Sequence, residues 1–288
     1  MHADDDQPAL DISSAANPRV KWLVSLRKRR VREAQGVAVV EGRDELVVAL
    51  DAGVRPTAVF YCPGLGDSSA RTQLLSRLRD LGAEIVSLSG AAFAKASYRE
   101  SPDGWLAVVA TPASSLDRLS LGPQALLLVC ESIEKPGNLG AMLRTAEAVG
   151  ADAVIAASPV SDWANPNVVR ASKGAVFAIP LGTGSTSDVL EWLRRQQVRI
   201  VVTTPQADDV VSDLDLTGPT AVVVGAEHAG LTDAWFEQAD ATAKLPMSGQ
   251  VNSLNVSTTA AVCLYEAIRQ RAVARAGGVA PGEAILAQ

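Results

Sequence analysis

An unbroken apolar run is the feature that most constrains the fold of this chain. Residues 125–130 read Ala-Leu-Leu-Leu-Val-Cys, without one polar side chain. Such a strand is typical of a parallel sheet that helices cover on both faces. Comparable strands are expected at 153–156, 198–203 and 221–225, with a shorter one near Leu245. Helical patterns lie around 139–150, 187–196, 230–239 and 255–275. This alternation predicts an α/β domain.

A smaller α/β unit precedes this domain. Its strands are expected at 37–40, 58–61, 85–88 and 105–110, and its helices at 44–52 and 73–81. The Thr-Pro-Ala-Ser-Ser stretch from Thr111 and the Gly122-Pro123 pair are typical of a connection between domains. The predicted division is a flexible tail (1–16), an N-terminal domain (17–112), a linker (113–123), a second domain (124–276) and a frayed C-terminus (277–288).

Composition excludes several classes of protein. The 288 residues include two histidines and three cysteines, without a Cys-x-x-Cys pair. That count excludes a disulfide framework and argues against zinc, so free buried thiols and no metal are expected. No apolar run is long enough for a membrane helix, and no signal-peptide core follows the acidic start, so no membrane association and a cytoplasmic location are expected. The net charge of −6 argues against a protein that coats nucleic acid, but it permits a local basic patch.

Basic residues gather near the N-terminus in what reads as one helix. They are Arg19, Lys21, Arg27, Lys28, Arg29, Arg30 and Arg32. A run of this kind is often only a solvated helix face. Four consecutive basic residues in an acidic protein are at least as consistent with contacts to phosphate groups. Both interpretations stay open at this point.

Polar residues follow two of the predicted strands. The first segment, 131–146, contains Asn138 near a helix start and Arg144 about two turns further on. The second, 222–231, places Glu227 between two glycines. Open α/β sheets bind ligands at such carboxyl ends of strands. The alternatives are that Asn138 caps the helix, that Arg144 forms a surface ion pair, and that Glu227 caps a helix after a tight turn.

A third segment, 245–257, crowds asparagines and serines at the start of the final helix. Free backbone amides and polar side chains there can bind a carboxylate or hydroxyl groups of a ligand. Simple capping requires one such residue, not four. The turn at 182–187 carries two glycines between a strand and a helix but lacks a third. It is therefore read as an ordinary turn, with a nicotinamide or flavin site as the alternative.

The three segments together resemble the SpoU/TrmH branch of the SPOUT methyltransferases. The patterns N-x-G-A-x-x-R-T-A, G-x-E-x-x-G-L and P-M-x-G-x-x-x-S-L-N-V-S stand here in the family's order, and the likeness covers about 125–270. The N-terminal unit resembles the family's RNA-binding domain, which is similar to a ribosomal-protein (L30e/L7Ae-like) fold. Residues 17–21 (Asn-Pro-Arg-Val-Lys) and 40–42 (Val-Glu-Gly) carry that second likeness.

The resemblance implies an enzyme that transfers a methyl group from S-adenosylmethionine to a ribose 2′-hydroxyl of RNA, without a metal. It also implies a deep trefoil knot in the second domain and a homodimer formed through that domain, with the site completed across the interface. Arg144 would be the catalytic residue, with Asn138, Glu227 and Asn255 orienting it or the substrate. The donor would contact Thr203, Thr204, Gly225, Glu227, Leu245, Met247, Ser253, Leu254, Asn255 and Ser257. RNA would contact Arg19, Lys21, Arg27, Lys28, Arg29, Arg30, Arg144 and Arg170.

Length and the N-terminal unit favour 23S rRNA as the substrate. A role in resistance to a ribosome-targeting antibiotic, of the avilamycin or thiostrepton type, and a housekeeping role are both open. The alternatives are a tRNA 2′-O-methyltransferase and a non-catalytic RNA-binding protein of the same fold. Because an arginine stays protonated, Arg144 is expected to position a phosphate and stabilise the developing alkoxide rather than to act as a base.

Overall fold

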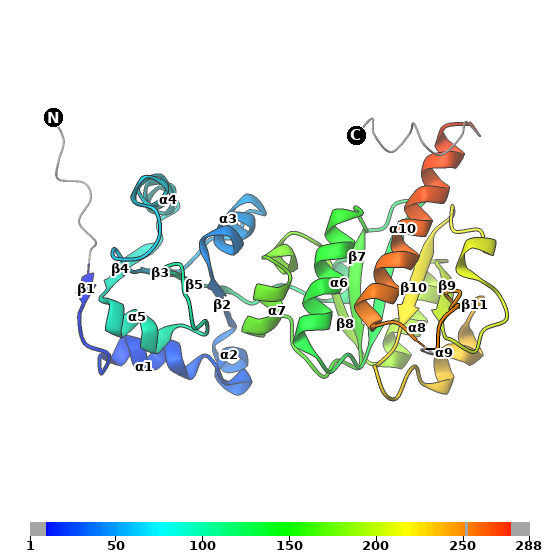
Figure 1. Cartoon of the computed structure of the whole chain (residues 1–288), viewed down its shortest axis with the longest axis horizontal. Helices are drawn as coiled ribbons and strands as arrows, with labels where there is room; N and C mark the ends of the chain where they lie inside the picture. The colour runs from blue at the N-terminus through cyan, green and yellow to red at the C-terminus, as the bar shows by residue number, and fades with distance from the viewer. Residues whose placement is uncertain (1–9, 251–252, 278–288) are drawn as a thin grey trace. The chain divides into compact units, whose positions relative to one another are not determined.

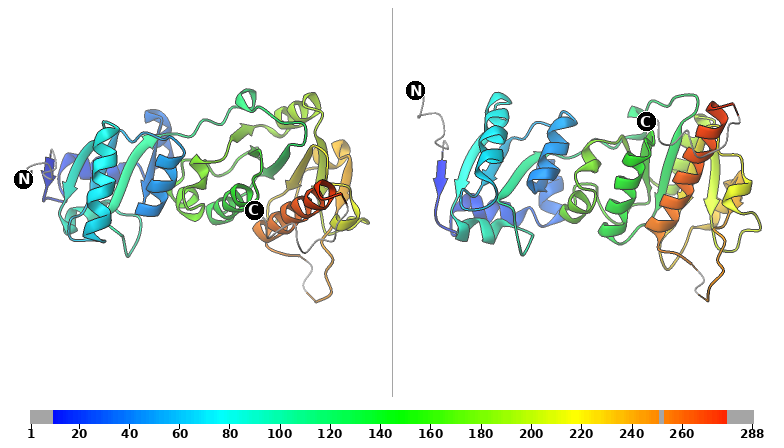
Figure 2. Two further views of the ribbon diagram at one scale, coloured as in Figure 1. Left: turned by 90° about the horizontal axis from the view of Figure 1, so that it is seen from above. Right: turned by 45° about the horizontal axis from the view of Figure 1, so that its top comes forward.

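Two compact units make up the chain. The computed structural model describes residues 10–250 and 253–277. Unit 1 comprises the described residues up to Pro112 together with Asp162–Ala178, and unit 2 comprises Ala113–Ser161 and the described residues from Ile179 onwards. Figure 1 labels the helices and strands, and Figure 2 shows them from two further directions. Across the described ranges, no helix combines the length and the apolar character that crossing a bilayer requires.

Unit 1 is a five-stranded sheet with helices on both faces. Its strands, in the order β1-β4-β3-β5-β2, are β1 (Leu10–Ile12), β2 (Val37–Glu41), β3 (Ala58–Tyr61), β4 (Glu84–Leu88) and β5 (Trp105–Ala110). Its helices are α1 (Pro18–Ser25), α2 (Arg29–Gln35), α3 (Arg43–Asp51), α4 (Ser68–Asp80), α5 (Gly90–Ala96) and α7 (Pro166–Ala171). Leu23 of α1 and Phe93 of α5 share one core with Phe60 of β3, while α3 and α4 cover the other face (Figure 1).

Two predictions for this unit were wrong. Residues 10–12, expected in the tail, form β1, which pairs in parallel with β4; residues 1–9 of that tail lie outside the described residues. The basic segment forms two helices, α1 and α2, rather than one. Between the two helices, the backbone carbonyls of Leu26 and Arg27 each accept a hydrogen bond from the Arg32 Nη1, at 3.1 Å. Arg32 is 2% exposed and is therefore a structural residue, not part of an RNA-binding face.

The Val-Glu-Gly motif of β2 organises a buried polar network. The Glu41 carboxylate accepts from the Tyr98 backbone nitrogen at 2.9 Å and from the Ser97 hydroxyl. Gly42 has φ +117°, and a β-carbon there would overlap the Glu45 carboxylate. The motif is thus explained by local packing, because only glycine fits this backbone conformation and this space.

Unit 2 is an all-parallel six-stranded sheet. Its strands, in the order β11-β9-β10-β6-β7-β8, are β6 (Leu126–Glu131), β7 (Ala153–Ala157), β8 (Leu181–Gly184), β9 (Arg199–Thr203), β10 (Thr220–Val224) and β11 (Ala241–Ala243). Its helices are α6 (Pro136–Ala148), α8 (Thr186–Arg195), α9 (Asp233–Gln238) and α10 (Val256–Arg275). The short strand expected near Leu245 lies slightly earlier, as β11.

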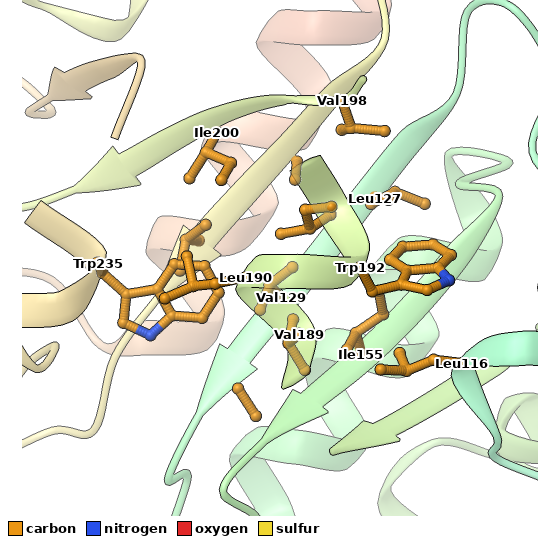
Figure 3. Packing of buried hydrophobic residues seen from close by; sticks show 14 of the residues in the cluster. Leu116, Leu127, Val129, Ile155, Val189, Leu190, Trp192, Val198, Ile200 and Trp235 are labelled. Carbon is orange, nitrogen blue, oxygen red and sulfur yellow. The ribbon is translucent and has the colours of Figure 1, made fainter. Parts of the chain in front are cut away.

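Alternating side chains of β6 face two different helix layers. Leu127 and Val129 point into a core with Val189 of α8 and Trp235 of α9 (Figure 3). The next residue, Cys130, faces the other way, with its sulfur 3.9 Å from that of Met142 on α6. On that second face α6 lies beside α10 (Figure 1). Successive side chains of a β-strand point to opposite faces of the sheet. Because helices cover both faces here, every position of the strand is buried, which explains the unbroken apolar run.

The predicted domain boundaries differ from these units in two places. Leu116, in the expected linker, packs in the unit 2 core beside Ile155 (Figure 3), because its segment carries leucines that the sheet can bury. Asp162–Ala178, inside the range assigned to the second domain, leaves the unit 2 sheet after β7, packs in unit 1 as α7 and a 3₁₀ turn (Ala175–Phe177), and returns at β8. The turn at 182–187 is the ordinary turn expected, because Ser185 caps α8 in a capping box with Asp188. The knot stays a prediction.

Candidate functional site

A cleft of about 730 Å³ opens at the carboxyl ends of β9, β10 and β11 in unit 2. Its walls come from these strand ends, from the loop after β10 and from the start of α10. From β6 the chain continues to β7 and β8 on one side, and then crosses to β9, β10 and β11 on the other side. The order in which strands are added thus reverses between β6 and β10. Ligands in open α/β sheets bind at such a switch point.

The loop after β10 closes on itself beside the cleft. The Ala226 nitrogen donates to the Gly230 oxygen at 3.1 Å, and the Gly230 nitrogen donates back to the Ala226 oxygen at 3.0 Å. Gly230 has φ +69°, and a β-carbon on Gly225 would overlap the Gly230 backbone. The two glycines of this motif are therefore required for the chain to turn back so tightly, and Glu227 lies within the resulting loop.

Three predicted catalytic residues are joined by hydrogen bonds. The Asn138 Nδ2 donates to Glu227 Oε1, and the Asn255 Nδ2 donates to Asn138 Oδ1 at 3.2 Å. The strand register explains the first bond. Cys130 near the end of β6 pairs with Val224 at the end of β10, so the two following loops begin at the same level of the sheet.

The capping alternatives can now be decided. Lys135, not Asn138, is the N-cap of α6, and Asn138 makes its bond to Glu227 instead. Asn255 does cap α10, because its Oδ1 accepts from the Ser257 nitrogen at 2.9 Å, but its Nδ2 remains available for Asn138. One asparagine thus starts a helix and extends the polar bridge.

Arg144 lies apart from this bridge. It is exposed on α6, does not line the cleft, and has no ion pair within residues 10–250 and 253–277. The surface ion-pair alternative therefore finds no support in the described residues. The cleft and Arg144 are separate features of one chain.

Most of the predicted donor-binding residues meet in the cleft. Its lining includes Thr203, Thr204, Gly225, Glu227, Leu245, Met247, Ser253, Leu254 and Asn255. Ser257 is absent from the lining, and its hydroxyl donates to Asn255 Oδ1 at 2.6 Å. Sequence reasoning missed other lining residues, namely Lys135, Gln206, Phe236, Lys244 and Cys263. The Gly-rich and Asn/Ser-rich segments could be recognised because their composition indicates backbone turns. These other lining residues are single side chains whose position in the cleft depends on the fold.

The cysteines are buried thiols, as expected. Burial, together with the nearby Glu266, raises the pKa of Cys263 to about 12. Burial likewise raises the pKa of Cys130 to about 12. Both thiols are protonated at neutral pH, so the thiol that lines the cleft is not a nucleophile. No cluster of three or more potential metal-ligating side chains occurs in the part of the chain that the structure describes.

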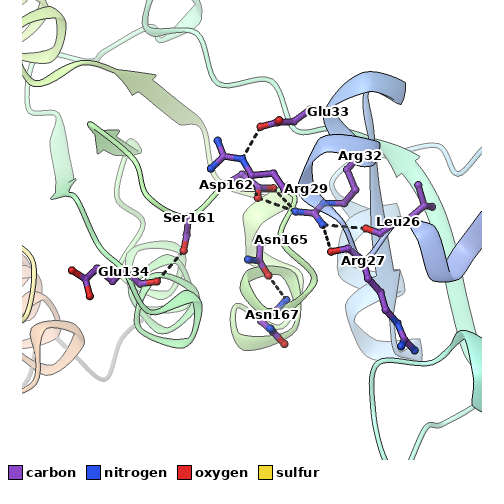
Figure 4. Close-up of polar contacts among 10 residues, drawn as sticks. All are labelled: Leu26, Arg27, Arg29, Arg32, Glu33, Glu134, Ser161, Asp162, Asn165 and Asn167. Carbon is purple, nitrogen blue, oxygen red and sulfur yellow. Dashed lines mark hydrogen bonds and ion pairs between the residues drawn. The ribbon is translucent and has the colours of Figure 1, made fainter.

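The predicted RNA-binding residues of unit 1 fall into two groups. Arg19 pairs with Glu84 at 2.7 Å, and Arg27 donates to the Ser97 oxygen at 2.6 Å while lying over the Tyr98 ring. Figure 4 shows Arg29 bonded to Glu33 at 2.7 Å, and Arg32 bonded to Asp162. The second group is exposed and has no hydrogen bond or ion pair from its side chains to other described residues: Lys21, Lys28, Arg30 and Arg170.

Comparison with known proteins bears on both units. Residues 125–265 match the SpoU rRNA Methylase family, and residues 17–107 match the MRM3-like substrate binding domain. The chain is 31% identical to a 23S rRNA (uridine(2479)-2′-O)-methyltransferase of Streptomyces viridochromogenes, over 92% of this chain and 94% of that protein.

The chain belongs to the SpoU rRNA methylase family. A crystal structure of an RNA 2′-O ribose methyltransferase superposes with a TM-score of 0.81 at 39% identity, covering 91% of this chain and 99% of that one. The SpoU methyltransferase AviRb of S. viridochromogenes, in complex with AdoMet, superposes with a TM-score of 0.82 at 30% identity, covering 88% and 98%. The predictions of family, α/β fold class, RNA ribose 2′-O-methyltransferase class and S-adenosylmethionine as methyl donor are confirmed.

The cleft suits that donor chemically. S-adenosylmethionine carries a positively charged sulfonium, a flat aromatic adenine ring, a ribose and an amino-acid group. Glu227 supplies a carboxylate whose Oε2 is buried and without a partner among the described residues. Leu231, Leu245 and Leu254 supply apolar wall, and a buried carboxylate oxygen attracts a positive charge more strongly than one in water. The residues present therefore fit the methyl donor.

Proposed function

We propose that this chain methylates a ribose 2′-hydroxyl of 23S rRNA. The observation that carries the proposal is the Glu227–Asn138–Asn255 bridge, because it joins the donor cleft to helix α6, on which Arg144 lies. The Streptomyces relative that this chain matches over nearly its whole length acts on 23S rRNA. The substrate-binding domain matched at residues 17–107 supports a large RNA substrate.

The donor supplies an electrophilic methyl group when it is bound. Glu227 would pair its carboxylate with the positive charge of the donor, and Asn138 keeps that carboxylate in place by donating to its Oε1. Arg144 remains protonated, so it is proposed to bind a phosphate of the RNA and to stabilise the 2′-oxygen as the hydroxyl proton passes to solvent water. Preorganised charges of this kind act on the transition state rather than on the ground state.

Unit 1 is proposed to bind the RNA through Lys21, Lys28, Arg30 and Arg170. Charge alone does not select them, since Arg19, Arg27 and Arg29 are equally basic. The difference is that those three are already bound within unit 1. Arg30→Gln should therefore lower the slope of log affinity against log salt by about one unit. Arg19→Gln is the matched control, with a smaller expected effect because Glu84 already neutralises Arg19.

A homodimer formed through unit 2 is part of the proposal. Val262 and Tyr265 on α10 are 43% and 56% exposed, although both are large apolar side chains. Helix α10 lies beside α6, so a second copy on this face would approach the helix that carries Arg144. Val262→Glu/Tyr265→Glu should convert a dimer to a monomer in light scattering. A wild-type monomer at micromolar concentration would contradict this part.

The direct test is methyl transfer from labelled S-adenosylmethionine to separated 23S, 16S and transfer RNA. Label is expected in 23S rRNA as an alkali-stable 2′-O-methyl dinucleotide. Arg144→Ala should lower the transfer rate at least about 100-fold and leave donor affinity unchanged. Arg195→Ala, which removes an exposed arginine of α8, is the control and should keep full activity.

Other outcomes select the alternatives. Label in transfer RNA would assign the chain to that substrate class. Donor and RNA binding without transfer to naked RNA or to assembled subunits would indicate a non-catalytic RNA-binding protein. A cytoplasmic location is part of the proposal, because ribosomal RNA is the proposed substrate. The resistance prediction is tested by expressing the wild type and Arg144→Ala in a sensitive strain and comparing growth with avilamycin or thiostrepton.

A further inference from the structure

Glu131 is a buried carboxylate at the C-terminal end of β6. It is only 1% exposed. Its Oε2 accepts from the Thr232 nitrogen at 2.8 Å, and its Oε1 accepts from the Thr232 hydroxyl at 2.9 Å and the Thr186 hydroxyl at 2.5 Å. No Lys, Arg or His of the described residues forms a salt bridge with it. The carboxylate is therefore held by neutral donors alone.

Burying a carboxylate is costly, so its donors must be fixed in place to compensate. The neighbouring positions of β6 are all apolar, and an apolar residue at 131 would have continued the buried strand. The sheet itself does not require an acid at this position. The Glu131 carboxylate instead links β6 by hydrogen bonds to two other segments, namely residue 232 and the start of α8.

One of these segments is the far end of the cleft loop. Gly230 and Leu231 line the cleft, and Thr232 follows directly. Thr232 is also the N-cap of α9, yet its side chain makes no capping bond, because its hydroxyl is turned to Glu131. Phe236 of α9 is another cleft residue. Glu131 thus anchors both the loop and the helix that follows it.

The loop has two ends, and Glu227 lies between them. The near end continues from β10 and is fixed by the sheet. The two bonds between Ala226 and Gly230 close the loop. The far end at Thr232 has Glu131 as its anchor. Thr232 stands two positions after Gly230, which is bonded to Ala226, so its anchor adjoins the loop that carries Glu227 and its buried Oε2.

We propose that Glu131 is a positioning residue that fixes the loop at 225–232, and through it Glu227, for binding of the methyl donor. The proposal deepens the proposed function and rests on it. Glu131 does not itself touch the donor, because it is absent from the cleft lining. Its effect passes through Thr232, so loss of either partner should produce the same defect.

The test compares four variants with the wild type by donor calorimetry, by hydrogen exchange of the loop amides and by methyl transfer. Glu131→Gln and Thr232→Val should each weaken S-adenosylmethionine binding about tenfold or more, which is the expected scale for loss of a charge-assisted bond. Both should speed exchange at 226–232, and Thr232→Ser should restore wild-type behaviour because it restores the hydroxyl. Thr186→Val is the matched control. It also removes a hydroxyl that donates to Glu131, but Thr186 belongs to α8 and does not line the cleft. It should change donor affinity less than twofold.

The outcomes separate this proposal from the function on which it rests. If Thr186→Val and Thr232→Val weaken donor binding equally, Glu131 only stabilises the fold and the positioning role is refuted. Unchanged donor affinity in Glu131→Gln also refutes it. If the wild type binds the donor but methylates no RNA, the proposed function fails while the affinity series still decides the role of Glu131. A wild type that binds no donor overturns both.

Discussion

Replacing Arg32 with methionine should destabilise unit 1 strongly. Arg32 lies on α2 and Asp162 lies just before α7, and Figure 4 shows the guanidinium turned to that carboxylate. The Arg32 Nη2 donates to both Asp162 oxygens, at 2.8 and 3.1 Å, and its Nη1 donates to two backbone carbonyls. The side chain of Arg32 is 3% exposed and that of Asp162 is 17% exposed. The pair thus ties Asp162–Ala178 to the rest of unit 1.

The cost follows from what the substitution leaves behind. Removing one partner of a buried pair costs about 3–5 kcal/mol, because the other charge stays buried without compensation. Water reaches part of Asp162, and the Arg29 Nε remains 3.8 Å from its Oδ2, so the lower end, about 3 kcal/mol, is expected for Arg32→Met. Asp162→Asn should cost less, and the double variant should cost clearly less than the sum of the two single ones. Urea denaturation of the full chain, followed by fluorescence and circular dichroism, measures these free energies.

A surface pair provides the control. Arg195 and Glu191 are paired at 3.0 Å on α8, with side chains 59% and 71% exposed. Arg195→Met should cost no more than about 0.5 kcal/mol, since exposed pairs contribute little. A cost below about 1 kcal/mol for Arg32→Met, or strict additivity with Asp162→Asn, would refute the reasoning that this pair fixes the segment.

Three further predictions concern unit 2. Gly225→Ala should abolish measurable donor binding in calorimetry, because a methyl group there overlaps the backbone of Gly230; retained binding would show that the loop can open. The hydrogen bond from Arg269 lowers the pKa of Glu266 in the folded protein. The ionised carboxylate therefore stabilises the fold at pH values above its unfolded-state pKa. This stabilisation is lost as the pH falls through the lower folded-state pKa. Glu266→Gln should therefore lower the melting temperature more at pH 7 than at pH 3, and an equal loss at both would contradict this. Because burial raises the pKa of Cys130 to about 12, iodoacetamide at pH 8 should leave it unmodified in the native protein, and mass spectrometry would detect any label.

The sequence predicted unit 2 well because its signals are strong and local. An apolar run such as 126–130 is typical of a strand inside a sheet with helices on both faces, and the structure places it there. The turn glycines were equally informative, since Gly225 and Gly230 permit a loop that other residues do not. The second and third motifs therefore pointed to the cleft, and Asn138 of the first motif is joined to them by hydrogen bonds. Short elements such as α5, α7 and β1 were missed, because their few residues carry no clear period.

Side-chain roles depended instead on contacts between distant parts of the chain. Nothing local distinguishes Arg32 from Arg30, yet the first is buried against Asp162 and the second is exposed. Likewise Glu131 reads as the last residue of a strand until Thr232, which is 101 positions away, is found beside it. Apolar runs and turn glycines are patterns of neighbouring residues, so they can be read directly from the sequence. The sequence by itself therefore determined the fold class, the family and the outline of the cleft. Which charges are neutralised, and by which partner, was decided only by the tertiary structure, because an ion pair or hydrogen bond depends on a distance in space that sequence separation does not record.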